Sequence, residues 1–156
     1  MQVREARTHD WPVVAALLAE LGRPDVRGRD DEDEHRAVFE GYLRRPDAVA
    51  LVAEENGEIV GFVDLEFRDR LNFGTPQAWI PDLIVAEAAR SRGAGKALLA
   101  AAEERARSRG CFALTLESAN WRERAHAFYE REGMNNVSAS FAKILGGEEY
   151  PPAPRL

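Results

Sequence analysis

The stretch from Arg90 to Lys96 combines the residue types that bind a diphosphate. Its sequence, Arg-Ser-Arg-Gly-Ala-Gly-Lys, lies between an apolar run typical of a strand and a longer run with helical periodicity. Glycines at such a junction let the backbone approach a ligand without a Cβ in the way. The free N–H groups and the dipole of the first helical turn favour an anion, and the basic side chains add positive charge. The other interpretation is a tight turn that the glycines shape without any ligand.

Two common nucleotide-binding motifs are absent from this stretch. Lys96 is followed by Ala97, and the spacing of the glycines does not match GxxxxGK[ST]. The dinucleotide motif GxGxxG is also absent, and the predicted helix begins late in the chain, after several strands with an antiparallel pattern. A nucleotide-binding module is therefore disfavoured.

The elements that must position this turn alternate between helical and strand patterns. In chain order we expect a strand over 2–6, helices over 12–21 and 34–44, strands over 48–53 and 59–67 joined by a turn at 54–57, a strand over 78–85, a helix over 95–109, a strand over 113–117, a helix over 122–132 and a last strand over 137–145. Thr8 or Asp10 is expected to cap the first helix. Pro81 cannot donate to a ladder and marks a bulge or an edge. The order predicts a mixed α/β (α+β) fold with a largely antiparallel central sheet flanked by helices.

Length and composition limit the classes of protein to consider. The 156 residues suit a single domain, predicted over 1–145, with a glycine- and proline-rich tail over 146–156. The net charge of −6 argues against nucleic acid, and no apolar run approaches the ~20 residues of a membrane span. A lone cysteine, Cys111, agrees with a reducing compartment, so we expect a cytoplasmic protein. The three histidines lie far apart, and no metal site is expected.

Two motifs together resemble the GNAT family of N-acetyltransferases. Residues 90–95 match its R/Q-x-x-G-x-G/A signature, and residues 120–134 look like its N…A-x-x-F-Y-x-x-x-G-F segment, with Met134 where phenylalanine is usual. The resemblance covers roughly residues 2–145. It implies the acyl-CoA N-acyltransferase (GNAT) fold and an enzyme that moves an acetyl group from acetyl-coenzyme A, as cosubstrate, to a primary amine. The amine would attack directly, without an acyl-enzyme.

The resemblance also implies which residues hold coenzyme A. The backbone of the turn would bind the pyrophosphate, with Gly93 and Gly95 central. The preceding strand would pair with the pantetheine arm, and the N–H of Leu83 is the candidate donor to the oxyanion. Asn120 would hydrogen-bond the arm, or cap a helix before Trp121. The implied cofactor-binding residues are Leu83, Ile84, Val85, Arg90, Arg92, Gly93, Ala94, Gly95, Lys96 and Asn120.

Three further residues are candidates for proton transfer. Tyr129 matches the family position that often protonates the departing thiolate, although a tyrosine on this helix face could simply pack. Many relatives place a glutamate on the strand before the glycine turn, where this chain has Trp79, Pro81 and Asp82. Asp82 and then Glu117 are the nearest carboxylates that could act as the base. Either could instead be a solvent-facing or ion-paired acid, and a water chain could serve in their place.

The sequence leaves the acceptor open. The acids at 30–34 would attract a cationic amine or favour the dipole of the second helix, whereas the arginines at 68 and 70 would favour a carboxylate or phosphonate. The chain looks similar to acetyltransferases of small-molecule amines, including the aminoalkylphosphonate and aminoglycoside kinds. The alternatives are a catalytically inactive coenzyme A sensor and a protein or peptide N-acetyltransferase. A homodimer could form through the last strand and the tail.

Overall fold

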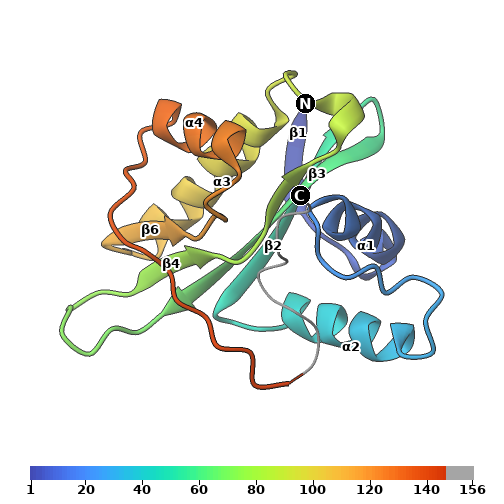
Figure 1. Ribbon diagram of the computed structural model, residues 1–156, viewed down its shortest axis with the longest axis horizontal. Helices are drawn as coiled ribbons and strands as arrows, with labels where there is room; N and C mark the ends of the chain where they lie inside the picture. Colours follow the sequence, from blue (N-terminus) through green and yellow to red (C-terminus); the bar gives the residue numbers. More distant parts are fainter. Residues whose placement is uncertain (147–156) are drawn as a thin grey trace. The chain divides into compact units, whose positions relative to one another are not determined.

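The computed structural model describes residues 1–146, which fall into two compact units, Met1–Leu116 and the segment that begins at Glu117 (Figure 1). The first unit holds β1 (Gln2–Glu5), a 3-10 turn (Thr8–Asp10), α1 (Trp11–Glu20), α2 (Glu32–Leu43), β2 (Ala48–Glu55), β3 (Glu58–Arg68), β4 (Gln77–Ile80), β5 (Leu83–Val85), a second 3-10 turn (Glu87–Ala89), α3 (Ala94–Ser108) and β6 (Ala113–Leu116). The second unit holds α4 (Glu123–Arg131). The predicted tail lies outside the described residues from 147 onward.

Six strands form one sheet in the order β1-β2-β3-β4-β6, with β5 also paired to β3. Every pairing is antiparallel except that of β4 with β6, which confirms the predicted mixed, largely antiparallel sheet. The β2–β3 hairpin turns at Asn56 (φ 52°) and Gly57 (φ 80°). Positive φ at both central residues is what a two-residue type I′ hairpin requires, and Asn-Gly is the pair that accepts it most readily.

The two faces of the sheet carry different helices. Side chains alternate along a strand, so the even-numbered residues of β3 share one face. On that face Val52, Phe62 and Ile84 form a buried cluster with Trp11 of α1 and Phe39 of α2. The neighbouring Gly61 faces the other way, against Leu98 of α3. Thus α1 and α2 cover one face of the sheet, and α3 covers the other.

A β-bulge separates β4 from β5. β3 pairs Glu66 with Trp79 and Val63 with Leu83, so two residues of β3 lie opposite three on the facing chain, Ile80, Pro81 and Asp82. The ladder is completed irregularly: the N–H of Asp64 donates to the carbonyl of Asp82 at 3.1 Å, whereas the N–H of Asp82 donates to a side-chain oxygen of Asp64 at 2.6 Å. The bulge expected at Pro81 is confirmed.

One local prediction was wrong, and a second is confirmed only in part. Residues 137–145 form no strand, although apolar and polar residues alternate there. Val137, Phe141 and Leu145 are each more than 80% exposed, and no strand of the described residues pairs with the segment. Without a ladder partner, an alternating pattern does not fix an extended chain. Asp10 is the N-cap residue of α1, as expected, but neither it nor Thr8 makes a side-chain capping hydrogen bond to the helix, because the Asp10 carboxylate instead accepts hydrogen bonds from the Arg4 side chain and the Arg7 N–H.

Candidate active site

The strand before the glycine turn has one free edge. In an antiparallel ladder alternate residues direct their N–H and C=O groups toward the partner. The N–H of Ala86 donates to the carbonyl of Val60 at 2.8 Å, and the Asp82 carbonyl accepts from Asp64, so Leu83 and Val85 direct their backbone groups away from β3. β6 follows β4 only as far as Ile80. Within the described residues no strand therefore pairs with the outer edge of β5, and Leu83 offers its N–H there.

The glycine turn leads directly into α3. Gly93, the residue before the first helical residue Ala94, has φ 88°, and a Cβ built on it would meet no atom within 4 Å. Ser91 also has a positive φ, 69°, which few non-glycine residues adopt. The first intrahelical bond runs from the Ala97 N–H to the Gly93 carbonyl at 3.0 Å. The N–H groups of the preceding helical residues have no intrahelical partner and lie at the positive end of the helix dipole.

Three basic side chains surround the start of this helix. Arg90, Arg92 and Lys96 are all exposed. Arg92 forms an ion pair with Glu55 at the end of β2, at 3.5 Å. An exposed pair of this kind is weak, so Arg92 can exchange its partner for a phosphate at little cost.

These features fit a coenzyme A molecule. Outward-facing backbone groups on β5 can pair with an amide-containing arm as an added strand would, and the open start of α3 can hold a diphosphate. Among residues 1–146, no group of three histidine, cysteine or acidic side chains is placed to hold a metal ion. No helix in that part of the chain is long and apolar enough to cross a membrane.

Asp82 lies in the bulge, directly before Leu83, and its carboxylate is bound to a cation. The Arg23 Nε donates to Asp82 Oδ1 at 2.8 Å, and another nitrogen of Arg23 donates to the Pro81 carbonyl at 3.3 Å. Arg23 follows α1 in the chain, so this ion pair ties the end of α1 to the bulge. Of the two alternatives for Asp82, the structure shows an ion-paired acid, although the residue also borders the candidate site.

Asp64 is a second carboxyl at the bulge, and sequence reasoning missed it. It lies on the α1/α2 face of β3, and it accepts the N–H of Asp82. Burial is the main cause that raises the pKa of Asp64 well above its usual 3.8, and the neighbouring Asp82 carboxylate raises it further. The available signal was the two acids of the alternating run FVDLEF, Asp64 and Glu66, at positions where a half-buried strand would normally place apolar residues on the covered face.

Two polar atoms near these carboxyl groups are buried without a partner. The Tyr42 hydroxyl of α2 and the Trp79 indole N–H of β4 have no hydrogen-bond partner among the described residues. Burial raises the pKa of Tyr42 above its usual range, and the nearby charges of Asp64 and Glu66 raise it further. Buried polar groups are normally satisfied, so each of these atoms has a hydrogen bond that the described residues do not supply.

In the second unit, Tyr129 lies on α4 beside Phe128, with ring centroids 5.5 Å apart. Burial raises the pKa of Tyr129 above 10, although the Arg122 charge opposes this rise. Asn120 and Glu117 are exposed. The residue before α4 is Arg122, so Asn120 is not the cap of this helix.

The two charged segments that were considered for the acceptor make contacts within the chain. Glu32, Asp33 and Glu34 occupy the first turn of α2, where they favour the helix dipole. Asp31 binds Arg29 and His35. Arg68 is the last residue of β3, and its Cζ lies 3.6 Å from the centroid of the Trp79 ring. The charge of Arg68 is therefore held against the Trp79 side chain, on the face of the sheet that α1 and α2 cover.

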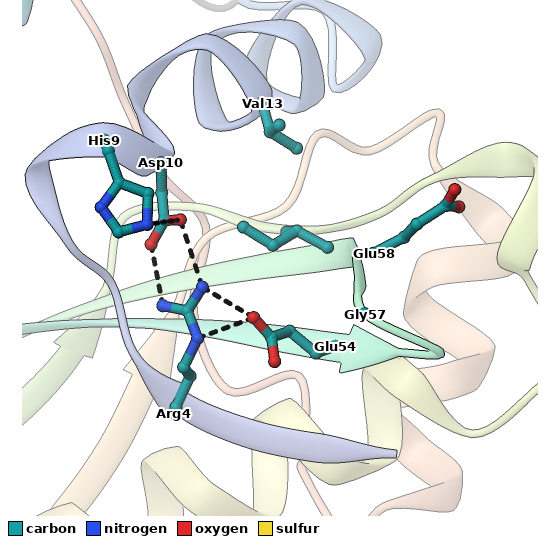
Figure 2. Close-up of a pocket in the computed structure, with 8 residues that line it drawn as sticks. Arg4, His9, Asp10, Val13, Glu54, Gly57 and Glu58 are labelled. Atoms are coloured by element: carbon teal, nitrogen blue, oxygen red, sulfur yellow. Dashed lines mark hydrogen bonds and ion pairs between the residues drawn. The ribbon is translucent and has the colours of Figure 1, made fainter.

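A surface hollow of about 540 Å³ lies near the β2–β3 hairpin, apart from these residues (Figure 2). Figure 2 shows the Arg4 guanidinium between the carboxylates of Asp10 and Glu54, which it binds at 2.8 Å and 2.7 Å. Arg4 pairs with two of the three carboxylates that line this hollow, and no predicted site residue lines it. It is better explained as a structural network that joins β1, β2 and the start of α1.

Known proteins match the chain along most of its length. Residues 6–134 match the acetyltransferase (GNAT) family. An uncharacterised N-acetyltransferase of Bacillus subtilis is 34% identical over 85% of this chain and 89% of its own. The aminoalkylphosphonate N-acetyltransferase of Salmonella typhimurium is 33% identical over 92% of this chain and 91% of its own. A solved structure of a transcriptional regulator from Bacillus halodurans superposes with a TM-score of 0.81, at 28% identity, over 92% of this chain and 99% of that one.

The chain belongs to the acetyltransferase (GNAT) family. Family members use acetyl-coenzyme A, and the matched relatives are N-acetyltransferases, so this protein is an acetyl-coenzyme A-dependent N-acetyltransferase. The predicted family and fold are confirmed.

Proposed function

We propose that the protein transfers the acetyl group of acetyl-coenzyme A to the primary amine of a small molecule, by direct attack of the nitrogen on the thioester. The observation that carries this proposal is the free edge at Leu83, ten residues before a helix that begins at a left-handed glycine. One backbone segment thus offers a donor for the thioester carbonyl, and the next offers a cradle for the pyrophosphate.

The residues would divide the work as follows. The backbone of Leu83 and Val85 pairs with the pantetheine arm, and the Leu83 N–H donates to the oxygen that becomes negative during attack. Such a donor contributes about 3 kcal/mol to stabilising the transition state. The N–H groups from Gly93 to Lys96 bind the pyrophosphate, and Arg90 and Arg92 neutralise its charge. Tyr129 donates a proton to the departing sulfur; its raised pKa keeps the hydroxyl protonated at neutral pH.

A small-molecule amine is favoured over a peptide because of the aminoalkylphosphonate N-acetyltransferase, which matches nine-tenths of both chains. Arg68, which contacts the Trp79 ring, supplies a cation that could bind a phosphonate or carboxylate on the acceptor. The proposed acceptor is therefore a primary amine that also carries an anionic group.

Calorimetric titration of acetyl-coenzyme A, with adenosine diphosphate as the control, tests the cosubstrate site. We expect micromolar binding that depends on the pantetheine arm. Turnover is then measured with 2-aminoethylphosphonate, β-alanine, ethanolamine and a lysine-containing peptide. Activity confined to the first two supports the proposed acceptor. Activity only on the peptide would replace the small-molecule acceptor with a protein one, and tight binding without turnover of any amine would indicate a sensor.

A further inference from the structure

We propose that the carboxylate of Asp64 accepts the proton that the acceptor ammonium must lose before its nitrogen attacks, and that Asp82 and Arg23 hold Asp64 in position. This inference rests on the proposed function, since it assigns a residue to the same reaction. It places the base on β3, the strand that pairs with β4 and β5 on either side of Asp82.

Asp64 lies directly beside the strand that carries the proposed oxyanion donor. Its Oδ1 lies 2.6 Å from the N–H of Asp82, the residue directly before Leu83. One peptide unit thus links Asp64 to the proposed oxyanion donor. The bulge produces this contact, because the Asp82 N–H binds the side chain of Asp64 instead of its carbonyl. The Asp64 carboxyl is therefore fixed by the backbone at the point where β5 becomes free on its outer edge.

The two acids at the bulge differ in their partners. Asp82 gives one oxygen to Arg23 at 2.8 Å, and a guanidinium keeps its charge at any working pH. Asp82 is therefore paired with a permanent cation. Asp64 forms no ion pair with a cation among the described residues, and its carboxylate is destabilised by burial and by Asp82. A general base works best when its pKa approaches the working pH, and the raised pKa of Asp64 moves it in that direction.

A hydroxyl unpartnered among the described residues lies near the two carboxyl groups. The Tyr42 hydroxyl is buried without a partner among the described residues, and it lies close enough to Asp64, Glu66 and Asp82 to respond to their charges. A hydroxyl oxygen can accept a hydrogen bond from an ammonium group, which would also bind the carboxylate of Asp64. An incoming amine would thus satisfy Tyr42 and offset the repulsion between the two acids. Trp79, whose indole N–H is also unpartnered, adds a donor for a polar group of the acceptor.

Acetyl transfer moves two protons from the nitrogen of the acceptor. The ammonium gives one proton to the Asp64 carboxylate and becomes a neutral amine. The nitrogen forms a bond to the carbonyl carbon of the thioester, the carbon–sulfur bond breaks, and its electron pair goes to sulfur. A second proton from the nitrogen finishes on that sulfur, by way of Tyr129 in the proposed mechanism. Asp64 then releases its proton to solvent, so each turnover yields an amide, a thiol and one proton.

Asp64→Asn is the test variant, because the amide keeps an oxygen for the Asp82 N–H but cannot accept a proton. We expect kcat/KM near pH 7 to fall about 100-fold, with unchanged binding of acetyl-coenzyme A. The defect should shrink as the pH rises toward the pKa of the acceptor, because an amine that is already neutral needs no base. A fall that is equal at every pH, or no fall, would overturn the proposal.

Two further variants separate catalysis from structure. Glu66→Gln removes a carboxylate from the same face of β3, two residues away, where it pairs with Arg45 at 3.2 Å; we expect kcat/KM within twofold of wild type.

Asp82→Asn removes the charge that raises the pKa of Asp64, so the acid limb of the pH–rate profile should move to lower pH. Arg23, Tyr42, Glu66 and Arg45 are the other charged or titratable groups near the pair. An acid limb that stays in place in Asp82→Asn would also contradict the role of Asp64.

This result can be separated from a failure of the proposed function. If the wild-type protein does not bind acetyl-coenzyme A, the proposed function fails and Asp64 is not involved. If the wild type turns over an amine and Asp64→Asn does so equally well, only the assignment of the base fails.

Discussion

Gly61 of β3 and Leu98 of α3 are in such close contact that no side chain fits between them. A Cβ on Gly61 would lie 2.8 Å from Cδ1 of Leu98 and 3.1 Å from the carbonyl oxygen of Ile84. Leu98 is fully buried, and the carbonyl belongs to the strand that carries the candidate site. This contact therefore sets the distance between α3 and the sheet beside β5.

We expect Gly61→Ala to lower the free energy of unfolding by about 2 kcal/mol, because Leu98 must leave its place in a packed core. Chemical denaturation would measure the change. Gly41→Ala is the matched control: Gly41 lies inside α2 with nothing within 4 Å of a Cβ, so alanine should stabilise by up to about 1 kcal/mol. Equal effects at both positions would show that the contact with Leu98 is unimportant.

Gly93→Val should abolish binding of acetyl-coenzyme A. Its side chain would project into the open space where we place the pyrophosphate, and its φ of 88° would strain a branched residue. Gly110→Val is the control, since Gly110 has φ 69° and equally open surroundings at the opposite end of α3. Both variants should lose similar stability in thermal denaturation. Only Gly93→Val should lose affinity in calorimetry, and retained affinity would contradict the assignment of the turn.

Tyr129→Phe should lower kcat about 100-fold and leave the affinity for acetyl-coenzyme A nearly unchanged, because the hydroxyl acts only on the departing sulfur. The raised pKa adds a pH signature. The wild-type rate should not decline from ionisation of Tyr129 until the pH is above 10. Steady-state kinetics from pH 6 to 10 would test both points, and an unchanged kcat would remove Tyr129 from the mechanism.

Asp10→Asn should destabilise the first unit by about 3 kcal/mol, because Arg4 would lose a buried partner. Burial raises the pKa of Asp10, but hydrogen bonds from Arg4 and the Arg7 N–H outweigh burial, so the pKa lies below 3.8. The stabilisation is therefore present above pH 4 and lost as the pH falls through the lowered pKa. Thermal melts at pH 7 and pH 3 should show a larger difference between wild type and variant at pH 7 than at pH 3.

Asp64→Asn should have the opposite dependence of stability on pH. Since the folded state raises the pKa of Asp64, the fold favours the protonated acid, and this advantage is lost as the pH rises through the raised pKa. The neutral amide should match wild type at pH 4 and melt at a higher temperature at pH 8. A variant that loses activity while it gains stability is what a functional acid predicts; loss of both at pH 8 would indicate a structural acid instead.

Local patterns predicted most elements of the first unit to within a few residues. The Asn-Gly turn at 56–57, the proline in the bulge and the glycine before α3 are signals that a few neighbouring residues determine. The strand expected over 137–145 failed because its formation depends on a partner strand, which its own alternation does not specify. Asp64 was missed for a similar reason. Its importance comes from Asp82, eighteen residues later, and the contact exists only because the ladder is irregular there.

The extra residue in the bulge also determines which face of the sheet each later side chain of the strand occupies. Before the bulge Trp79 faces the same side as Glu66; after it Ile84 faces the same side as Phe62. If Pro81 were paired in a regular ladder, with no bulge, every residue after it would shift by one position against β3 and its side chain would face the opposite side of the sheet. Leu83 would take its place opposite Phe62, its N–H would enter the ladder with β3, and Ile84 would point out of its core. The one-residue bulge thus decides which backbone amides of this strand face away from β3.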